Sequence, residues 1–334
     1  LRPTFRIFDR KSNSWNNMEF LGLLIGLALI LAGANYLTDG SVALAARFRV
    51  PGFLIGLTIV AVGTSTPELV VSFLSALEGQ GDMAVGNVVG SNIFNAFFIL
   101  GVCALIRPLP LTAGNIRRDL PIGVGASLIL CIVLADALFG AEPRIGRIEG
   151  FVMLALYVLT VWTAAQAARR ENAGRQEETG TTPRTTNGWL MALMILGGLG
   201  ALILGGEIFL RNAVAIARKL GISESVIAIT LVAGGTSLPE LASSAVSVYK
   251  GRTDIALGNI VGSNIANILL ILGLSATAMP LTPGGIDAVT LGMVVLSALL
   301  LFAAAFTFRR RMLDRWEGVI FLLIYGGYLV WLLR

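Results

Sequence analysis

The chain has 334 residues, of which 55% are hydrophobic and 13% are charged, and its mean hydropathy is +0.81. A soluble protein carries about a quarter charged residues, so this composition excludes a soluble globular fold and predicts an all-α, multi-pass membrane protein. The sequence has no His, and its two Cys, Cys103 and Cys131, stand alone in apolar stretches, which excludes a thiolate or imidazole metal site. Any metal ion that it handles must therefore be held by oxygen.

Residues 1–17 are predicted to be an N-terminal extension or tag, since Met18 is a natural start. After it, Gly, Pro and charged residues separate ten apolar stretches that suit transmembrane helices. The ten helices are expected at residues 18–46, 53–77, 82–106, 119–138, 148–168, 188–218, 224–249, 254–279, 285–307 and 316–333. The polar residues 169–187 read as a flexible cytoplasmic linker between two five-helix halves, 18–168 and 188–334.

Basic residues are unevenly shared between the two faces of this ten-helix topology. Loops after odd-numbered helices hold fifteen Lys and Arg, and the other face, counted from Met18, holds six. Because basic loops stay in the cytoplasm, we expect an inner (plasma) membrane location with both termini extracytoplasmic.

An internal repeat organises the chain. Residues 53–101 and 225–273 align without a gap at a constant offset of 172, and 26 of the 49 positions are identical. Five helices separate equivalent positions, so the second copy enters the membrane from the opposite side. This predicts two inverted-topology repeats, an architecture in which transporters bind their substrates near the midplane.

The repeat places two acids, Glu68 and Glu240, at matching positions inside apolar helices. An ionised carboxylate at the centre of a membrane helix costs about 2.5–3.5 kcal/mol on insertion scales. No Lys or Arg lies in either flanking stretch to neutralise them. Two such carboxylates facing each other would repel unless a cation lay between them, so the pattern predicts a cation site.

Residues around the two acids supply further oxygen ligands. Pro67 and Pro239 cannot donate a backbone hydrogen bond, so they are expected to free carbonyls near residues 61–63 and 233–235, helped by Gly63 and by Gly234 with Gly235. Thr64 and Thr236 each precede a Glu by four residues and so share its helical face. On the next helices, the same spacing joins Ser91 to Asn95 and Ser263 to Asn267. Carboxylates, hydroxyls, amides and carbonyls are ligands for hard cations such as Ca²⁺ and Na⁺.

At these residues the chain resembles the cation/calcium antiporter superfamily, and in particular its prokaryotic sodium/calcium exchangers. The motifs are GTSTPE at 63–68 with GNVVGSNIFN at 86–95, and GTSLPE at 235–240 with GNIVGSNIAN at 258–267. The resemblance implies electrogenic exchange of three Na⁺ for one Ca²⁺ by alternating access, in which the first and sixth helices slide across the rest.

The resemblance also implies roles for individual residues. Glu68, Glu240, Thr64 and Thr236 would bind Ca²⁺, and the Na⁺ or midplane positions would be Ala61, Ser65, Ser91, Asn95, Ala233, Ser237, Ser263 and Asn267. Potassium-dependent members carry Asp where this chain has Asn267, so K⁺ dependence is not expected. Apart from the transported ions and the lipid bilayer, we expect no cofactor, no nucleic-acid partner and a functional monomer.

Three other readings of the sequence stay open at this stage. An H⁺/Ca²⁺ antiporter with the same fold would let the two Glu trade protons for Ca²⁺. A passive cation channel would instead use a symmetric oligomeric filter, and an intramembrane enzyme would need a Glu pair with a bound metal. Charges near helix ends, Asp39, Glu207, Asp119 and Asp287, are read as interfacial or helix-dipole residues, with ion guidance as the alternative.

Overall fold

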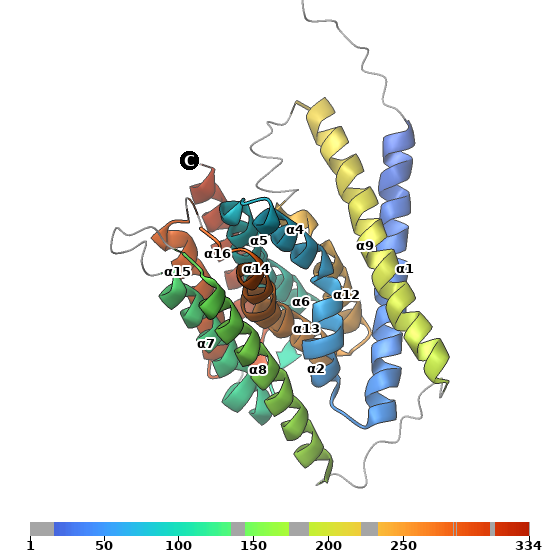
Figure 1. Cartoon of the computed structure of the whole chain (residues 1–334). Coiled ribbons are helices and arrows are strands. Elements are labelled where there is room, and N and C mark those ends of the chain that lie inside the picture. The colour runs from blue at the N-terminus through green and yellow to red at the C-terminus, as the bar shows by residue number, and fades with distance from the viewer. Residues whose placement is uncertain are drawn as a thin grey trace, which may run out of the picture.

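The computed structural model describes residues 17–134, 144–173, 187–221, 233–282, 284, 286–307 and 311–333, and these are almost entirely helical (Figure 1). The first half contains α1 (Asn17–Phe48), α2 (Gly52–Ile55), η1 (Gly56–Val60), α3 (Ala61–Thr64), α4 (Thr66–Leu77), α5 (Gly81–Ile93), η2 (Phe94–Ile99), α6 (Leu100–Ile106), η3 (Asn115–Asp119), α7 (Leu120–Val133) and α8 (Arg147–Ala173). The second half contains α9 (Gly188–Lys219), α11 (Ala233–Gly235), α12 (Leu238–Tyr249), α13 (Thr253–Ile265), η6 (Ala266–Leu272), α14 (Gly273–Ala278), α15 (Ala288–Ala304) and α16 (Arg315–Leu332). The η segments are π-helical.

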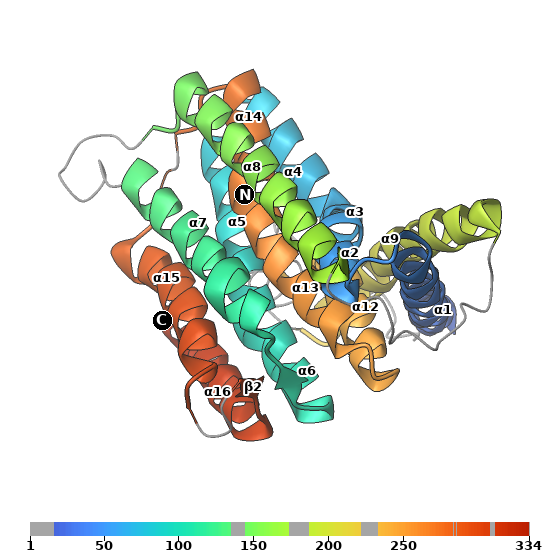
Figure 2. The same cartoon turned by 90° about the horizontal axis from the view of Figure 1, so that it is seen from below.

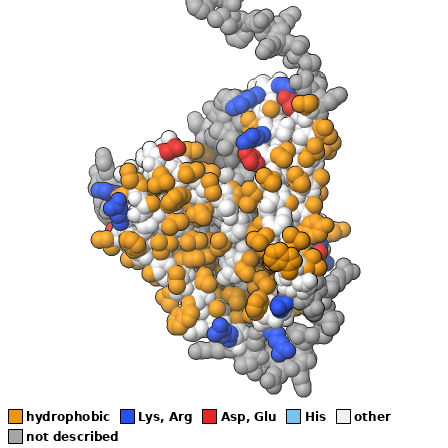
Figure 3. All heavy atoms as spheres, turned by 45° about the vertical axis from the view of Figure 1, so that its right-hand side comes forward, with side chains coloured by type: hydrophobic (Ala, Val, Ile, Leu, Met, Phe, Trp, Pro, Cys, Tyr) orange, Lys and Arg blue, Asp and Glu red, His pale blue; other side chains and the backbone are white. Residues whose placement is uncertain are grey.

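Length and composition identify the molecule as a membrane protein. Among the described residues, six helices are long and apolar enough to cross a bilayer, and a seventh span is reached if the bent pair 52–64 and 66–77 counts as one. Hydrophobic side chains cover the middle of the face in Figure 3, and Lys and Arg gather toward its ends. This distribution suits a surface in contact with lipid, with charges at the two membrane surfaces.

Two long helices, α1 and α9, lie side by side at one edge of the molecule (Figures 1 and 2). Glycines at matched positions of the repeat bring their backbones together. A Cβ at Gly33 would lie 2.7 Å from the carbonyl oxygen of Gly198, and a Cβ at Gly205 would lie 2.9 Å from that of Gly26. Because lipid tails give no hydrophobic driving force for helix association, such close van der Waals packing stabilises the pair.

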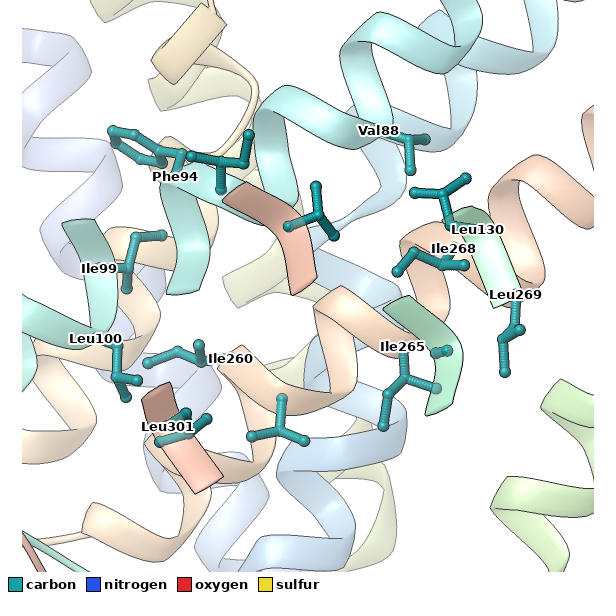
Figure 4. Close-up of a cluster of buried hydrophobic side chains, with 14 of the residues drawn as sticks. Val88, Phe94, Ile99, Leu100, Leu130, Ile260, Ile265, Ile268, Leu269 and Leu301 are labelled. Atoms are coloured by element: carbon teal, nitrogen blue, oxygen red, sulfur yellow. The ribbon is translucent and has the colours of Figure 1, made fainter. Parts of the chain in front are cut away.

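The remaining helices surround two central ones, α5–η2–α6 and α13–η6–α14. Their apolar side chains meet in the cluster drawn in Figure 4, where Val88 and Phe94 come from the first helix and Ile260 and Ile268 from the second. Leu130 of α7 closes the cluster on one side. Among the six candidate spans of the described residues, these two central helices are the most deeply buried.

Short backbone pairings join the halves in a symmetric way. The strand β1 (Leu109–Pro110) pairs antiparallel with β2 (Met312–Leu313), so a residue after α6 meets a residue before α16. Leu281, which follows α14, forms the corresponding bridge with Ile145, just before α8. Each half therefore anchors the loop that leads into the last helix of the other half.

The observed helix ends correct some predicted boundaries. Helix α8 continues to Ala173, so the first residues of the predicted linker are helical, and residues 174–186 lie outside the described residues. Helix α15 covers only 288–304 of the predicted 285–307, because Asp287 caps it by accepting a hydrogen bond from the Thr290 N–H. The predicted helix 224–249 is described only from Ala233, and the predicted end of 119–138 lies beyond the described Leu134.

Candidate ion-binding site

Each repeat has a broken helix at its motif. Helix α3 ends at Thr64 and α4 begins at Thr66, with a bend of 50° between residues 52–64 and 66–77. In the second repeat α11 ends at Gly235 and α12 begins at Leu238. Pro67 and Pro239 lie in the first turns of the new helices, where the missing N–H costs nothing. The prolines therefore start new helices, which leaves one serine at each junction.

Glu68 and Glu240 lie in the first turns of α4 and α12, and both side chains are 0% exposed. The N-terminus of a helix carries partial positive charge, which offsets part of the cost of burying a carboxylate there. Among the described residues, the salt bridges involve other acids, and neither Glu has a Lys or Arg partner. The expected pair of buried acids without a basic partner is therefore present among the described residues.

The serines at the two helix breaks reach across the repeat boundary. Ser65 Oγ donates to Glu240 Oε1 at 2.7 Å, and Ser237 Oγ donates to Glu68 Oε1 at the same distance. Ser91 Oγ makes a longer contact of 3.5 Å with Glu68 Oε1. Each carboxylate is thus held by a hydroxyl of the other repeat, which sequence spacing did not predict.

Several buried oxygens of the predicted site residues have no hydrogen-bond partner in the described protein. Buried polar groups nearly always have a partner, so these exceptions need an explanation. The unpartnered oxygens are Glu68 Oε2, Glu240 Oε2, Thr236 Oγ1, Ser263 Oγ, Asn95 Oδ1 and Asn267 Oδ1. Carboxylate, hydroxyl and amide oxygens are the ligand types that hard cations such as Ca²⁺ and Na⁺ prefer.

Backbone oxygens are less available than the prolines led us to expect. The carbonyl of Ala61 accepts hydrogen bonds from the Ser65 N–H at 2.9 Å and the Thr64 hydroxyl at 3.3 Å. The carbonyl of Val62 accepts from the Thr66 hydroxyl at 3.2 Å. The expectation that carbonyls 61–63 are free is therefore wrong for the first two, because neighbouring hydroxyls and the Ser65 N–H bond to them. Ala233 begins α11, and its side chain lies outside the described set.

Two asparagines that the sequence reading overlooked support the broken helices. Asn87 Nδ2 donates to the Glu68 carbonyl at 3.2 Å and to Ser72 Oγ at 2.9 Å. Asn259 accepts from the Thr64 hydroxyl at 3.2 Å, and its Nδ2 donates to Ser244 Oγ at 2.9 Å. The sequence does contain a signal for them, because Asn87 matches Asn259 and Ser72 matches Ser244 in the alignment of the two repeats.

Asn95 and Asn267 lie on π-helical segments. η2 begins at Phe94 and η6 at Ala266, which are matched positions, so Asn95 and Asn267 occupy equivalent places just inside the wider turns. Single π-helical turns are rare and occur frequently at functional sites. The i, i+4 argument for Ser91 with Asn95 assumed a regular α-helix and missed this change of winding.

Charges near the helix ends are bound to other groups. Lys250 Nζ lies 2.7 Å from Asp39 Oδ1, joining α1 to the end of α12, and Arg211 pairs with Glu207 on α9. Asp119 does not sit in a helical first turn as expected, because η3 begins four residues earlier; it is buried and bonded to Arg118 and Asn115. Asp287, which was expected near a helix start, is the N-cap of α15 and accepts a hydrogen bond from the Thr290 N–H.

Known proteins are similar to this chain over nearly its whole length. The family model described as sodium/calcium exchanger protein matches residues 18–166 and 190–334. The sodium/calcium exchanger MaX1 of Methanosarcina acetivorans is 31% identical and the inner membrane protein YrbG of Escherichia coli is 36% identical, and the alignments cover 94% and 93% of this chain and 98% and 94% of those proteins. A solved structure of the sodium-calcium exchanger NCX_Mj superposes with a TM-score of 0.79 at 29% identity, covering 94% of this chain and 98% of that one.

The fold and the site define a multi-pass membrane transporter of the cation/Ca²⁺ exchanger type, not an enzyme. The chain belongs to the sodium/calcium exchanger family. The two matched stretches coincide with the two halves of the repeat, and the fold is that of NCX_Mj.

Proposed function

We propose that this protein is a secondary antiporter that exchanges Na⁺ for Ca²⁺, three to one, by alternating access. The observation that carries the proposal is the crosswise arrangement of Glu68 and Glu240. Each is fully buried, each accepts a hydrogen bond from a serine of the other repeat, and each keeps one oxygen without a partner among the described residues. A fixed protein cation would neutralise such a pair permanently. A pair without one needs a mobile cation, which suits transport.

The proposed site uses the residues that the sequence singled out. Ca²⁺ lies between the two carboxylates, with oxygens of Thr64 and Thr236 beside it. Na⁺ takes the flanking and midplane positions formed by Ala61, Ser65, Ser91, Asn95, Ala233, Ser237, Ser263 and Asn267. Because the same carboxylates serve both ions, binding of several Na⁺ displaces Ca²⁺, and competition at one site couples the two fluxes.

The proposed architecture has ten spans in two inverted five-helix repeats, residues 18–168 and 188–334, joined by the cytoplasmic residues 169–187 and preceded by the extension 1–17. Both termini lie outside the cytoplasm, and one chain is the transporting unit. The α1–α9 pair, packed backbone to backbone, moves as one body across the other helices. In an inverted repeat such a movement exposes the site first to one side and then to the other.

The test is ⁴⁵Ca²⁺ uptake into proteoliposomes under Na⁺, K⁺ and H⁺ gradients imposed one at a time. We expect uptake only with Na⁺ inside, and a dependence on membrane potential that corresponds to one net charge per cycle. Uptake driven by a pH gradient without Na⁺ would instead support H⁺/Ca²⁺ exchange. A Ca²⁺ flux that does not saturate and needs no counter-ion would support a passive cation channel.

Two isosteric variants connect that flux to the site. Glu68→Gln and Glu240→Gln keep the shape of the side chain but remove one negative charge, so each is expected to abolish uptake. Glu78→Gln is the matched control, because Glu78 is exposed just beyond the end of α4 and its side chain accepts a described hydrogen bond from Gln80 only. Uptake by either site variant at the wild-type rate would reject the proposal.

A further inference from the structure

A pair of asparagines outside the proposed ligand set lies where the two central helices cross. Asn92 on α5 and Asn264 on α13 are equivalent residues of the repeat. Asn92 Nδ2 donates to the backbone carbonyl of Asn264 at 3.3 Å, and Asn264 Nδ2 donates to that of Asn92 at 3.4 Å. Each side chain therefore donates a hydrogen bond to the backbone of the other residue, which lies in the other repeat.

These contacts determine which way the Asn92 amide faces. A backbone carbonyl can only accept a hydrogen bond, so the NH₂ end of Asn92 must point to Asn264 and its Oδ1 must point away. Asn92 Oδ1 in turn accepts from Asn267 Nδ2 at 3.1 Å. Asn267 must therefore present its NH₂ end to Asn92, which leaves its Oδ1 on the other side. That Oδ1 is buried and has no protein partner among the described residues.

The orientation matters for a cation. An amide NH₂ carries partial positive charge and repels a cation, whereas the amide oxygen is a hard ligand for Na⁺ or Ca²⁺. Asn267 is fully buried in η6, so a flipped amide could not be screened by water. Fixing the orientation of the Asn267 amide therefore affects cation binding more at this buried position than it would at the surface.

We infer that Asn92 is a positioning residue, which holds the Asn267 amide with its oxygen toward the transported cation; this rests on the proposed function. Asn92 acts through Asn267 and does not itself bind the ion. The equivalent contact in the other repeat, from Asn264 to Asn95, is not made: Asn264 Oδ1 and both polar atoms of the Asn95 amide have no partner among the described residues. In the described part of the chain, the orienting contact is thus made on the Asn267 side alone.

The inference predicts a specific pattern in a double-mutant cycle. Asn92→Leu keeps the approximate volume but removes the acceptor, so the Asn267 amide loses its preferred flip state. We expect the Na⁺ concentration for half-maximal Ca²⁺ uptake to rise about 10- to 100-fold, as is typical when a residue that orients a metal ligand is lost. Asn267→Asp replaces the amide by a carboxylate, which presents an oxygen in either orientation. In that background Asn92→Leu should therefore change the half-maximal concentration less than about twofold.

Asn92→Ser covers the case in which the leucine variant does not fold, because a hydroxyl can rotate to donate or accept and so retains polarity without fixing the flip state. It should show the same rise in the wild-type background and the same insensitivity in the Asn267→Asp background. Equal effects in both backgrounds would overturn the inference, since they would indicate a merely structural role, and so would no effect in either. Failure of the proposed function is distinguishable, because wild-type protein would then show no Na⁺-driven uptake at all.

Discussion

Gly198 on α9 gives a direct test of how α1 and α9 are joined. A Cβ at this position would lie 2.7 Å from the backbone nitrogen of Leu37 and 2.9 Å from the carbonyl oxygen of Gly33. Heavy atoms in contact prefer roughly 3.5–4 Å, and backbone atoms cannot escape by changing rotamer. In Gly198→Ala the two helices must therefore move apart by about half an ångström or more, an estimate that follows from the same contact distances.

The cost of this overpacking is about 1–3 kcal/mol. Alanine is better than glycine in a helix by about 1 kcal/mol, which offsets part of that cost. The neighbouring residue provides the control, since a Cβ at Gly197 meets nothing within 4 Å. Gly197→Ala should therefore gain the helix preference without the clash, so that the two variants differ in stability by about 1–3 kcal/mol.

Thermal unfolding of the purified protein in detergent measures the difference. We expect Gly197→Ala to unfold at or above the wild-type Tm and Gly198→Ala several degrees below Gly197→Ala. Equal Tm values for the two variants would refute the account of close backbone packing, because adjacent glycines would then be interchangeable.

Three further predictions follow from the site and its surroundings. Ser237→Ala removes the hydroxyl that donates to Glu68 at 2.7 Å. Since a hydrogen bond to a charged group contributes about 1.5–3 kcal/mol, the Ca²⁺ concentration for half-maximal uptake should shift at least about tenfold. Ser275→Ala, which removes a buried hydroxyl without a described partner, should leave that concentration unchanged. Pro67→Ala restores an N–H that can bond the Gly63 carbonyl, so the helix break should close and uptake should fall while the helical circular dichroism signal stays constant; unchanged uptake would count against the role of the break. Lys250→Met removes an ion pair whose side chains are 26% and 53% exposed, so unfolding should become easier by less than about 1 kcal/mol in a denaturant titration, and a larger loss would show that this link is more than a surface pair.

Much of the helical framework was predictable because apolar length and Gly or Pro punctuation are local properties of the chain. The match between the predicted helix 82–106 and the observed 81–106 is an example. The end of α8 was not predictable, because the polar residues up to Ala173 lack an apolar face and yet continue the helix of the preceding span. The π-helical winding at Asn95 and Asn267 was not predictable either, because the sequence pattern there fits a regular α-helix.

The site shows the same division between local and tertiary information. The repeat singled out Glu68 and Glu240 as matched residues, since two unneutralised acids in apolar helices are conspicuous in any sequence. The crosswise bonds from Ser65 and Ser237 could not be predicted, because they depend on how one broken helix faces the other. Asn87 and Asn259 are identical between the repeats, but identity alone does not show that their side chains bond to the broken helices, because those contacts depend on tertiary packing.

Equilibrium binding of Ca²⁺ to the purified protein in Na⁺-free buffer tests most directly whether the two carboxylates share one ion. The account predicts that wild-type protein binds Ca²⁺, that Na⁺ displaces it, and that Glu68→Gln and Glu240→Gln each lose the binding completely. If each variant instead kept its own Ca²⁺ site with wild-type affinity, the two acids would act independently, and the shared site would be contradicted.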